Sequence, residues 1–182
     1  MAQAKSLLGP FAALLALMYL FVMWQAGAPP ERTHLIKYEA KGVLTVDPET
    51  IVRVTVRGKG GTQTFEKRGG AWFKTAHGDG AAVPKAMSDA LSLAVRFMNT
   101  ANPVRVFEAN ELPADPSKAF GLDDPALSVT LSTENGKVLA ADFGNLSSDG
   151  FLHYMRVEGR ESYFLMSRFV LQEWQKVAKA GP

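Results

Sequence analysis

Residues 51–67 read IVRVTVRGKGGTQTFEK, and this stretch decides the fold class of the chain. Val52, Val54 and Val56 alternate with polar residues, which is the period of a half-buried β-strand. The glycines of the segment GKGG tolerate a positive φ, and the alternation resumes beyond them in TQTFEK. The stretch therefore predicts a β-hairpin, and RGGAWF at 68–73 predicts a third strand after a second glycine break.

A helix is predicted after these strands. Asp79 is positioned to cap it and Pro84 falls near its first turn. Apolar residues then recur at steps of three and four, as on one face of a helix packed against a sheet; they are Val83, Met87, Leu91, Ala94 and Met98. Residues 103–107 predict a short strand, and the proline-punctuated segment 108–125 predicts an irregular connection.

The second half of the chain repeats this design. A shift of 75 residues brings Val54 onto Val129, and residues 135–136, Asn-Gly, form a strong hairpin turn. Residues 151–157 and 162–166 predict another hairpin. RFVLQEWQKVAK at 168–179 predicts a closing amphipathic helix, whose expected inward residues are Phe169, Val170, Trp174 and Val177. The expected fold is α+β, an antiparallel-sheet domain of two similar β-hairpin/helix units at 43–178.

The segment FGLDDPALSVTL at 120–131 reads as a corner before a strand. Proline at a strand's first position costs no ladder hydrogen bond, and Gly121 can adopt a backbone conformation closed to other residues. Together with FEKRGGAWF and HYMRVEGRESYFL, the segment resembles the bacterial domain of unknown function 4340 over roughly residues 51–171. The resemblance implies a membrane-anchored or exported α+β protein, in some members a companion of a transport system, without established catalytic residues.

The N-terminal region contains an uncharged segment, LLGPFAALLALMYLFVMW at 7–24. A helix of this length spans roughly 27 Å, close to the hydrocarbon thickness of a bilayer. We expect a short tail at 1–6, a single transmembrane helix at 7–26 and a linker at 27–42. The expected membrane anchor consists of Leu7, Leu8, Phe11, Leu14, Leu15, Leu17, Met18, Leu20, Phe21, Val22 and Trp24. The expected helix-packing face consists of the small residues Ala12, Ala13 and Ala16.

Cleavage and orientation are separate questions for this segment. AGA at 26–28 has the small-x-small form of a signal-peptidase site, but the apolar run is longer than that of a usual signal peptide, which favours a retained anchor. Lys5 and the terminal amine give the leading tail a positive bias. We therefore expect a bacterial inner-membrane protein with its C-terminal domain in the periplasm.

The composition and the motifs of the sequence exclude several kinds of binding and catalytic chemistry. The net charge is only +2, which gives no footprint for nucleic acid, and the absence of cysteine excludes disulfides and thiolate chemistry. His34, His77 and His153 lack ligand-type neighbours at helical spacing, and Asp123 and Asp124 point in opposite directions if extended. No serine lies on a G-x-S-x-G elbow. We expect no catalytic residue, no metal site and no cofactor.

Two functions remain open. The leading hypothesis is a non-catalytic accessory or scaffold subunit of a larger bacterial membrane protein complex, in contact with the bilayer and with other integral membrane subunits. Trp72 and Trp174 are expected in the core or, if exposed, as partner contacts. The alternative is a periplasmic module that binds a lipid or envelope glycan for an ABC-type transporter. It would need an apolar pocket between the two units, lined by residues such as Trp72, Phe107 or Tyr154.

Overall fold

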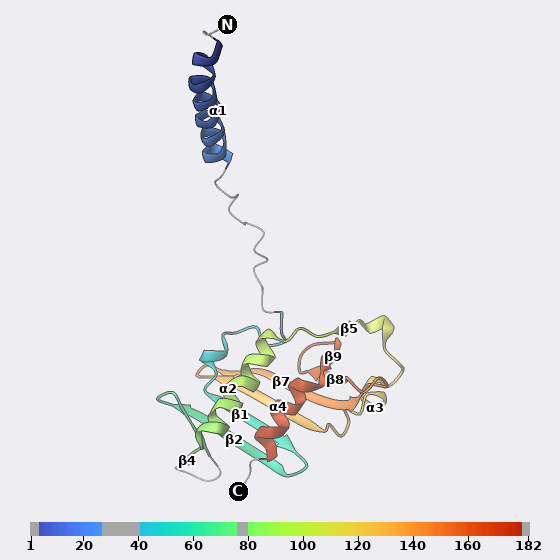
Figure 1. Ribbon diagram of the computed structural model, residues 1–182. Helices are drawn as coiled ribbons and strands as arrows, with labels where there is room; N and C mark the ends of the chain where they lie inside the picture. The colour runs from blue at the N-terminus through green and yellow to red at the C-terminus, as the bar shows by residue number, and fades with distance from the viewer. Residues whose placement is uncertain (1–3, 27–40, 76–79, 180–182) are drawn as a thin grey trace. The chain divides into compact units, whose positions relative to one another are not determined.

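The computed structural model describes residues 4–26, 41–75 and 80–179, without the side chains of residues 4–8 and 25–26. Figure 1 shows the chain from end to end. It divides into two compact units, residues 1–39 and residues 40–182. The expected linker at 27–42 lies largely outside the described residues, as does the expected cap Asp79.

The first unit contains helix α1, Ala4–Ala26, with Pro10 inside it. The predicted N-terminal helix is therefore present with the expected end. Among the helical residues described, none forms a segment that meets the length and apolarity of a membrane crossing. The predicted helix is thus confirmed, whereas the predicted membrane span is not supported.

The described strands of the second unit form one antiparallel sheet in the order β4-β3-β2-β1-β6-β7-β8-β9-β5. The strands of the first half are β1 Arg53–Gly58, β2 Gly61–Arg68, β3 Ala71–Lys74, β4 Ala81–Ala82 and β5 Arg105–Phe107. Those of the second half are β6 Leu127–Thr133, β7 Gly136–Leu146, β8 Leu152–Val157 and β9 Tyr163–Ser167. The predicted hairpins are confirmed, and the predicted strand at 103–107 begins two residues later.

Strands β1 and β6 join the two predicted units at the centre of the sheet. Val54 lies opposite Leu131, and Val56 lies opposite Val129. Strands β1 to β3 follow outward on one side and β6 to β8 on the other, so the repeat in the sequence corresponds to a repeat in the sheet. The two predicted β-hairpin/helix units are nevertheless not separate bodies, because they share one sheet and one core within residues 40–182.

Helices α2 (Lys85–Thr100) and α4 (Arg168–Lys179) pack on one face of the sheet, as Figure 1 shows. Four residues of the predicted apolar row are buried in α2 together with Val95; they are Met87, Leu91, Ala94 and Met98. Val83, the first residue of the predicted row, lies before the helix and is only partly buried, because α2 begins at Lys85. In α4, however, Phe169 is 41% exposed and Leu171 is buried in its place. The prediction for Phe169 was wrong because this residue lies in the first turn, where it packs edge-to-face on Phe97 at 5.0 Å beyond the sheet.

The connection predicted as irregular contains two short helices, η2 (Ala109–Glu111) and α3 (Pro116–Ala119). It brings Phe120 onto the second face of the sheet, where its ring stacks on Tyr154 with centroids 4.2 Å apart. The corner interpretation is confirmed at Gly121, whose φ of +68° lies in the region that favours glycine. A short 3-10 helix, η1 (Pro48–Thr50), precedes β1.

Candidate functional site

Helix α1 presents large apolar side chains on all sides. Phe11, Leu17 and Trp24 are 64%, 65% and 79% exposed, and the described apolar residues between them are more than half exposed as well. Ala12 and Ala16 lie one turn apart, and Ala13 lies beside them, so the predicted small-residue face exists on the helix. In water an apolar surface of this extent is unfavourable.

Neither tryptophan of the domain is a surface residue. Trp72 in β3 is 2% exposed, and its Nε1 donates a hydrogen bond to Ser92 Oγ at 3.2 Å. Trp174 in α4 is fully buried, and its Nε1 has no hydrogen-bond partner among the described residues. The expected core position of both tryptophans is therefore confirmed, and the alternative of an exposed partner contact is wrong, because strand alternation and the helical face turn these side chains into the core.

The apolar pocket expected between two units does not form from the expected residues. Trp72 lies on the helix-covered face, since it belongs to the buried core beneath α2. Phe107 and Tyr154 lie on the opposite face, in an aromatic cluster with Phe120. The strand register confirms this separation. Phe107 pairs with Tyr163, and Tyr163 also pairs with Arg156, whose side chain lies on the polar face.

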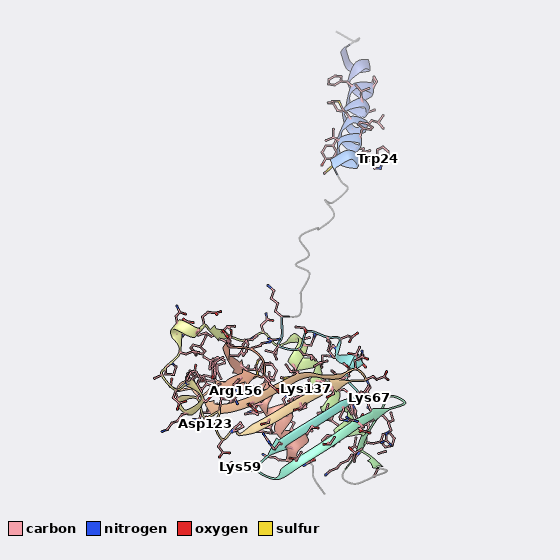
Figure 2. All side chains as sticks on the ribbon, turned by 180° about the vertical axis from the view of Figure 1, so that it is seen from behind. Trp24, Lys59, Lys67, Asp123, Lys137 and Arg156 are labelled. Carbon is pink, nitrogen blue, oxygen red and sulfur yellow. The ribbon has the colours of Figure 1, made fainter. Side chains whose placement is uncertain are left out.

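The sheet face away from the helices carries a ladder of polar contacts across three strands. Asp142 on β7 accepts from Ser128 Oγ at 2.7 Å and from Arg156 Nη2 at 2.9 Å. Arg156 Nη1 also donates to Ser117 Oγ at 3.2 Å, which holds α3 against the sheet. The hydrogen bond to Asp142 raises the pKa of Arg156, against the opposing effect of partial burial. Figure 2 shows Arg156 on this face.

This polar ladder reads as a structural element. Its ion pair is partly exposed, at 37% for Arg156 and 26% for Asp142, and such pairs contribute little to stability. A hollow of about 460 Å³ lies beside it, and Arg57 at its rim has no ion-pair partner in the described parts of the chain. The arrangement offers hydrogen-bond donors to an anion.

An apolar end surface lies at the β5 side of the domain, and we define it as Val104, Val106, Leu146, Phe151 and Phe169. Val104 and Phe151 are 64% and 67% exposed, and the other three are 41% to 46% exposed. Two backbone hydrogen bonds tie the segments of this surface to β9 and the start of α4: Val104 N donates to Leu165 O at 2.8 Å, and Arg168 N, beside Phe169, donates to Phe151 O at 3.0 Å. The sequence gives little signal for this surface, because its members come from four separate segments.

The expected absence of a metal site concerns His34 and His77, which lie outside the described residues, and His153. The ring of His153 contacts Gly144 O through Nδ1 at 3.1 Å. Asp123 and Asp124 are exposed in a bend. Among the residues that the structure describes, no three His, Cys, Asp or Glu side chains gather closely enough to hold an ion.

Comparisons with protein-family models, with curated proteins and with solved structures each found no match to this chain. The resemblance to the domain of unknown function 4340 therefore stays a prediction.

Proposed function

We propose that this protein is a membrane-anchored accessory subunit whose domain contacts a larger bacterial membrane protein complex. The observation that carries the proposal is the apolar surface of α1, with eleven large apolar side chains from Phe11 to Trp24 exposed. At about 0.8 to 1.5 kcal/mol for each half-exposed side chain, covering them is worth on the order of 10 kcal/mol. A bilayer supplies that cover around the whole helix.

Two sequence features support the same proposal. The uncharged segment 7–24 begins before the part of α1 whose side chains are described, which is 9–24. Lys5 precedes it and favours a cytoplasmic tail with a periplasmic domain. The resemblance to the domain of unknown function 4340 points in the same direction, and membership of that family is part of the proposal.

The apolar end surface is the proposed contact with the partner. The chain joins the domain at Gly42, whose N–H donates to Asn99 O, and Val104 follows Asn99 closely in the sequence. The 14 residues from 27 to 40 can span at most about 50 Å, so a partner embedded beside α1 lies within reach of this surface. A tether of this length also raises the effective concentration of the apolar end surface near such a partner.

A protein is a better occupant of this surface than an anionic lipid. The neighbouring charges are mixed: Arg105 pairs with Glu111 at 3.0 Å, and Asp149 lies two residues before Phe151. A surface that binds anionic lipid usually carries an excess of lysine and arginine. Apolar residues rimmed by paired charges are typical of protein interfaces.

The anchor is tested by fractionating cells that express the full tagged chain. We expect α1 to hold the chain in membranes through a carbonate wash, and the double substitution Leu14→Lys and Leu17→Lys to release it, since each charge at a helix centre costs about 2.5 to 3.5 kcal/mol. Recovery of the unsubstituted chain in the aqueous wash, with an N-terminus created beyond residue 26, would contradict the proposal.

The partner contact is tested by crosslinking the full chain in membranes before purification in mild detergent. We expect crosslinks to integral membrane proteins that the substitution Val104→Asp reduces at least fivefold. Val138→Asp is the matched control, because Val138 is also an exposed valine and lies on β7 outside the end surface. Crosslinks to lipid alone, or equal loss with both variants, would refute a protein partner.

A further inference from the structure

A large hollow lies at the other end of the domain, beneath the last turn of α4. Its volume is about 710 Å³. Its walls are the β1–β2 turn at 58–61, the end of β3 at Lys74, the last turn of α4 and the start of β6 at Leu127. Pockets of roughly 300 to 1,000 Å³ are the size that takes small organic ligands.

The charge of this hollow is of one sign. Lys59, Lys74 and Lys179 line it, and no acidic residue is among the described residues of its lining. Each lacks a carboxylate partner within the described part of the chain. Other lysines of the domain do have one: Lys67 pairs with Glu49 at 2.8 Å, and Lys137 pairs with Glu158 at 2.7 Å. Figure 2 shows Lys59 at the tip of its hairpin.

The frame of the hollow is fixed by a contact between β2 and α4. Gln63 Nε2 donates to Ala178 O at 2.7 Å, which holds the last turn of α4 over the hairpin. Thr62 and Gln175 add a hydroxyl and an amide to the lining, and Leu127 adds an apolar wall. Three lysines that line one hollow beside neutral donors suit an anion, because each ammonium can donate to a separate oxygen.

We propose that this hollow binds a small phosphate ester. A phosphate monoester carries up to two negative charges and several acceptor oxygens, so one group can satisfy several of the lysines at once. Its organic part would lie against Leu127, Ala126 and the hydroxyl and amide groups of the lining. The ester is either a free metabolite or the headgroup of an anionic phospholipid.

The site does not depend on the proposed function. The chain joins the domain beside Asn99, near the C-terminal end of α2, and Phe97 there contacts Phe169 at the start of α4. The hollow lies at the end of α4, about 15 Å further along the helix axis. Loss of anion binding and loss of the anchor or partner contact are therefore separate results.

The test is calorimetric titration of the full chain in a neutral detergent with glycerol 1-phosphate, with glycerol as the uncharged comparison. We expect saturable binding of the phosphate ester and none of glycerol. The triple variant Lys59→Gln, Lys74→Gln and Lys179→Gln should weaken binding at least tenfold, since each exposed ion pair is worth about two- to threefold. The matched control carries three other lysine-to-glutamine changes of equal charge, at Lys85, Lys118 and Lys137.

Vesicles distinguish the two sources. The proposed anchor α1 would carry the chain to any bilayer, so flotation is compared between phosphatidylglycerol vesicles and phosphatidylcholine vesicles without net charge. A lipid headgroup is shown if phosphatidylglycerol adds binding that the triple variant loses and that glycerol 1-phosphate fails to displace. Displacement by the soluble ester shows a free metabolite. Absence of saturable binding to either probe would overturn the proposal, and so would equal weakening by the triple variant and its control, because binding would then follow net charge alone.

Discussion

Replacing Gly42 by alanine tests how the domain holds the segment that leads to α1. A Cβ at this position would lie closer than 3.0 Å to backbone atoms of Met98 and Asn99, which cannot move without disturbing α2. Two hydrogen bonds depend on this approach, from Gly42 N to Asn99 O and from Leu44 N to Met98 O, each 2.8 Å long. We expect Gly42→Ala to detach the segment from the end of α2.

The magnitude follows from what is lost. Two backbone hydrogen bonds contribute about 1 kcal/mol each. Val43 and Leu44 are 1% and 2% exposed in the structure, and their partial exposure in the variant adds about 1 to 2 kcal/mol to the loss of stability. We therefore expect a loss of about 3 kcal/mol in the free energy of unfolding, or about 9 °C in Tm at roughly 3 °C per kcal/mol for a domain of this size.

The assay is thermal unfolding of the full chain in neutral detergent, followed by near-ultraviolet circular dichroism of the buried tryptophans. Gly60→Ala is the matched control, because a Cβ at Gly60 meets nothing within 4 Å and its φ is not in the positive region. The control should change Tm by less than 2 °C. If Gly42→Ala unfolds within 2 °C of Gly60→Ala, the packing argument is refuted.

Four further substitutions test the core, the corner and the pH dependence. Trp174→Phe should change the free energy of unfolding by less than about 1 kcal/mol, because it removes a buried N–H without a partner. Trp72→Phe also loses a hydrogen bond and should cost about 2 kcal/mol. Chemical denaturation measures both free energies, and equal costs would contradict this expectation. Gly121→Ala should cost about 1 to 2 kcal/mol because φ is +68° there, and an unchanged Tm would show that the corner can relax. Hydrogen bonds from Arg68 and Arg53 lower the pKa of Glu66 from its ordinary value of 4.5. The stability that these bonds add is therefore present above pH 4.5 and is lost as the pH falls through the lower pKa of the folded state. Glu66→Gln should flatten the fall of Tm with acid, and an unchanged slope would show that this carboxylate does not contribute.

The local elements could be predicted because their signals are local. Alternation from Val52 and from Leu127 identified the central strands, and the turn before Gly136 set a hairpin that the structure contains. The row from Met87 to Met98 identified the buried face of α2. These patterns depend only on residues a few positions apart.

The arrangement of those elements could not be predicted in the same way. Nothing near β5 in the sequence indicates that it pairs with β9, some 58 residues later, at the edge of the sheet. The pairing of β1 with β6 likewise turned two expected units into one sheet and placed Trp72 and Tyr154 on opposite faces. The lysine-lined hollow and the apolar end surface have the same origin, since each gathers residues from segments far apart in the chain.

The junction of β1 with β6 has a consequence during synthesis. About 75 residues separate equivalent positions of the two strands, so β1 waits roughly 4 to 15 seconds for its neighbour at ordinary bacterial translation speeds. Throughout that delay the nascent first half has an open backbone edge that could pair with the same strand of another growing chain. Crowded polysomes and fast induction should therefore favour inclusion bodies, and slower elongation over residues 108–126 should worsen the yield of native protein.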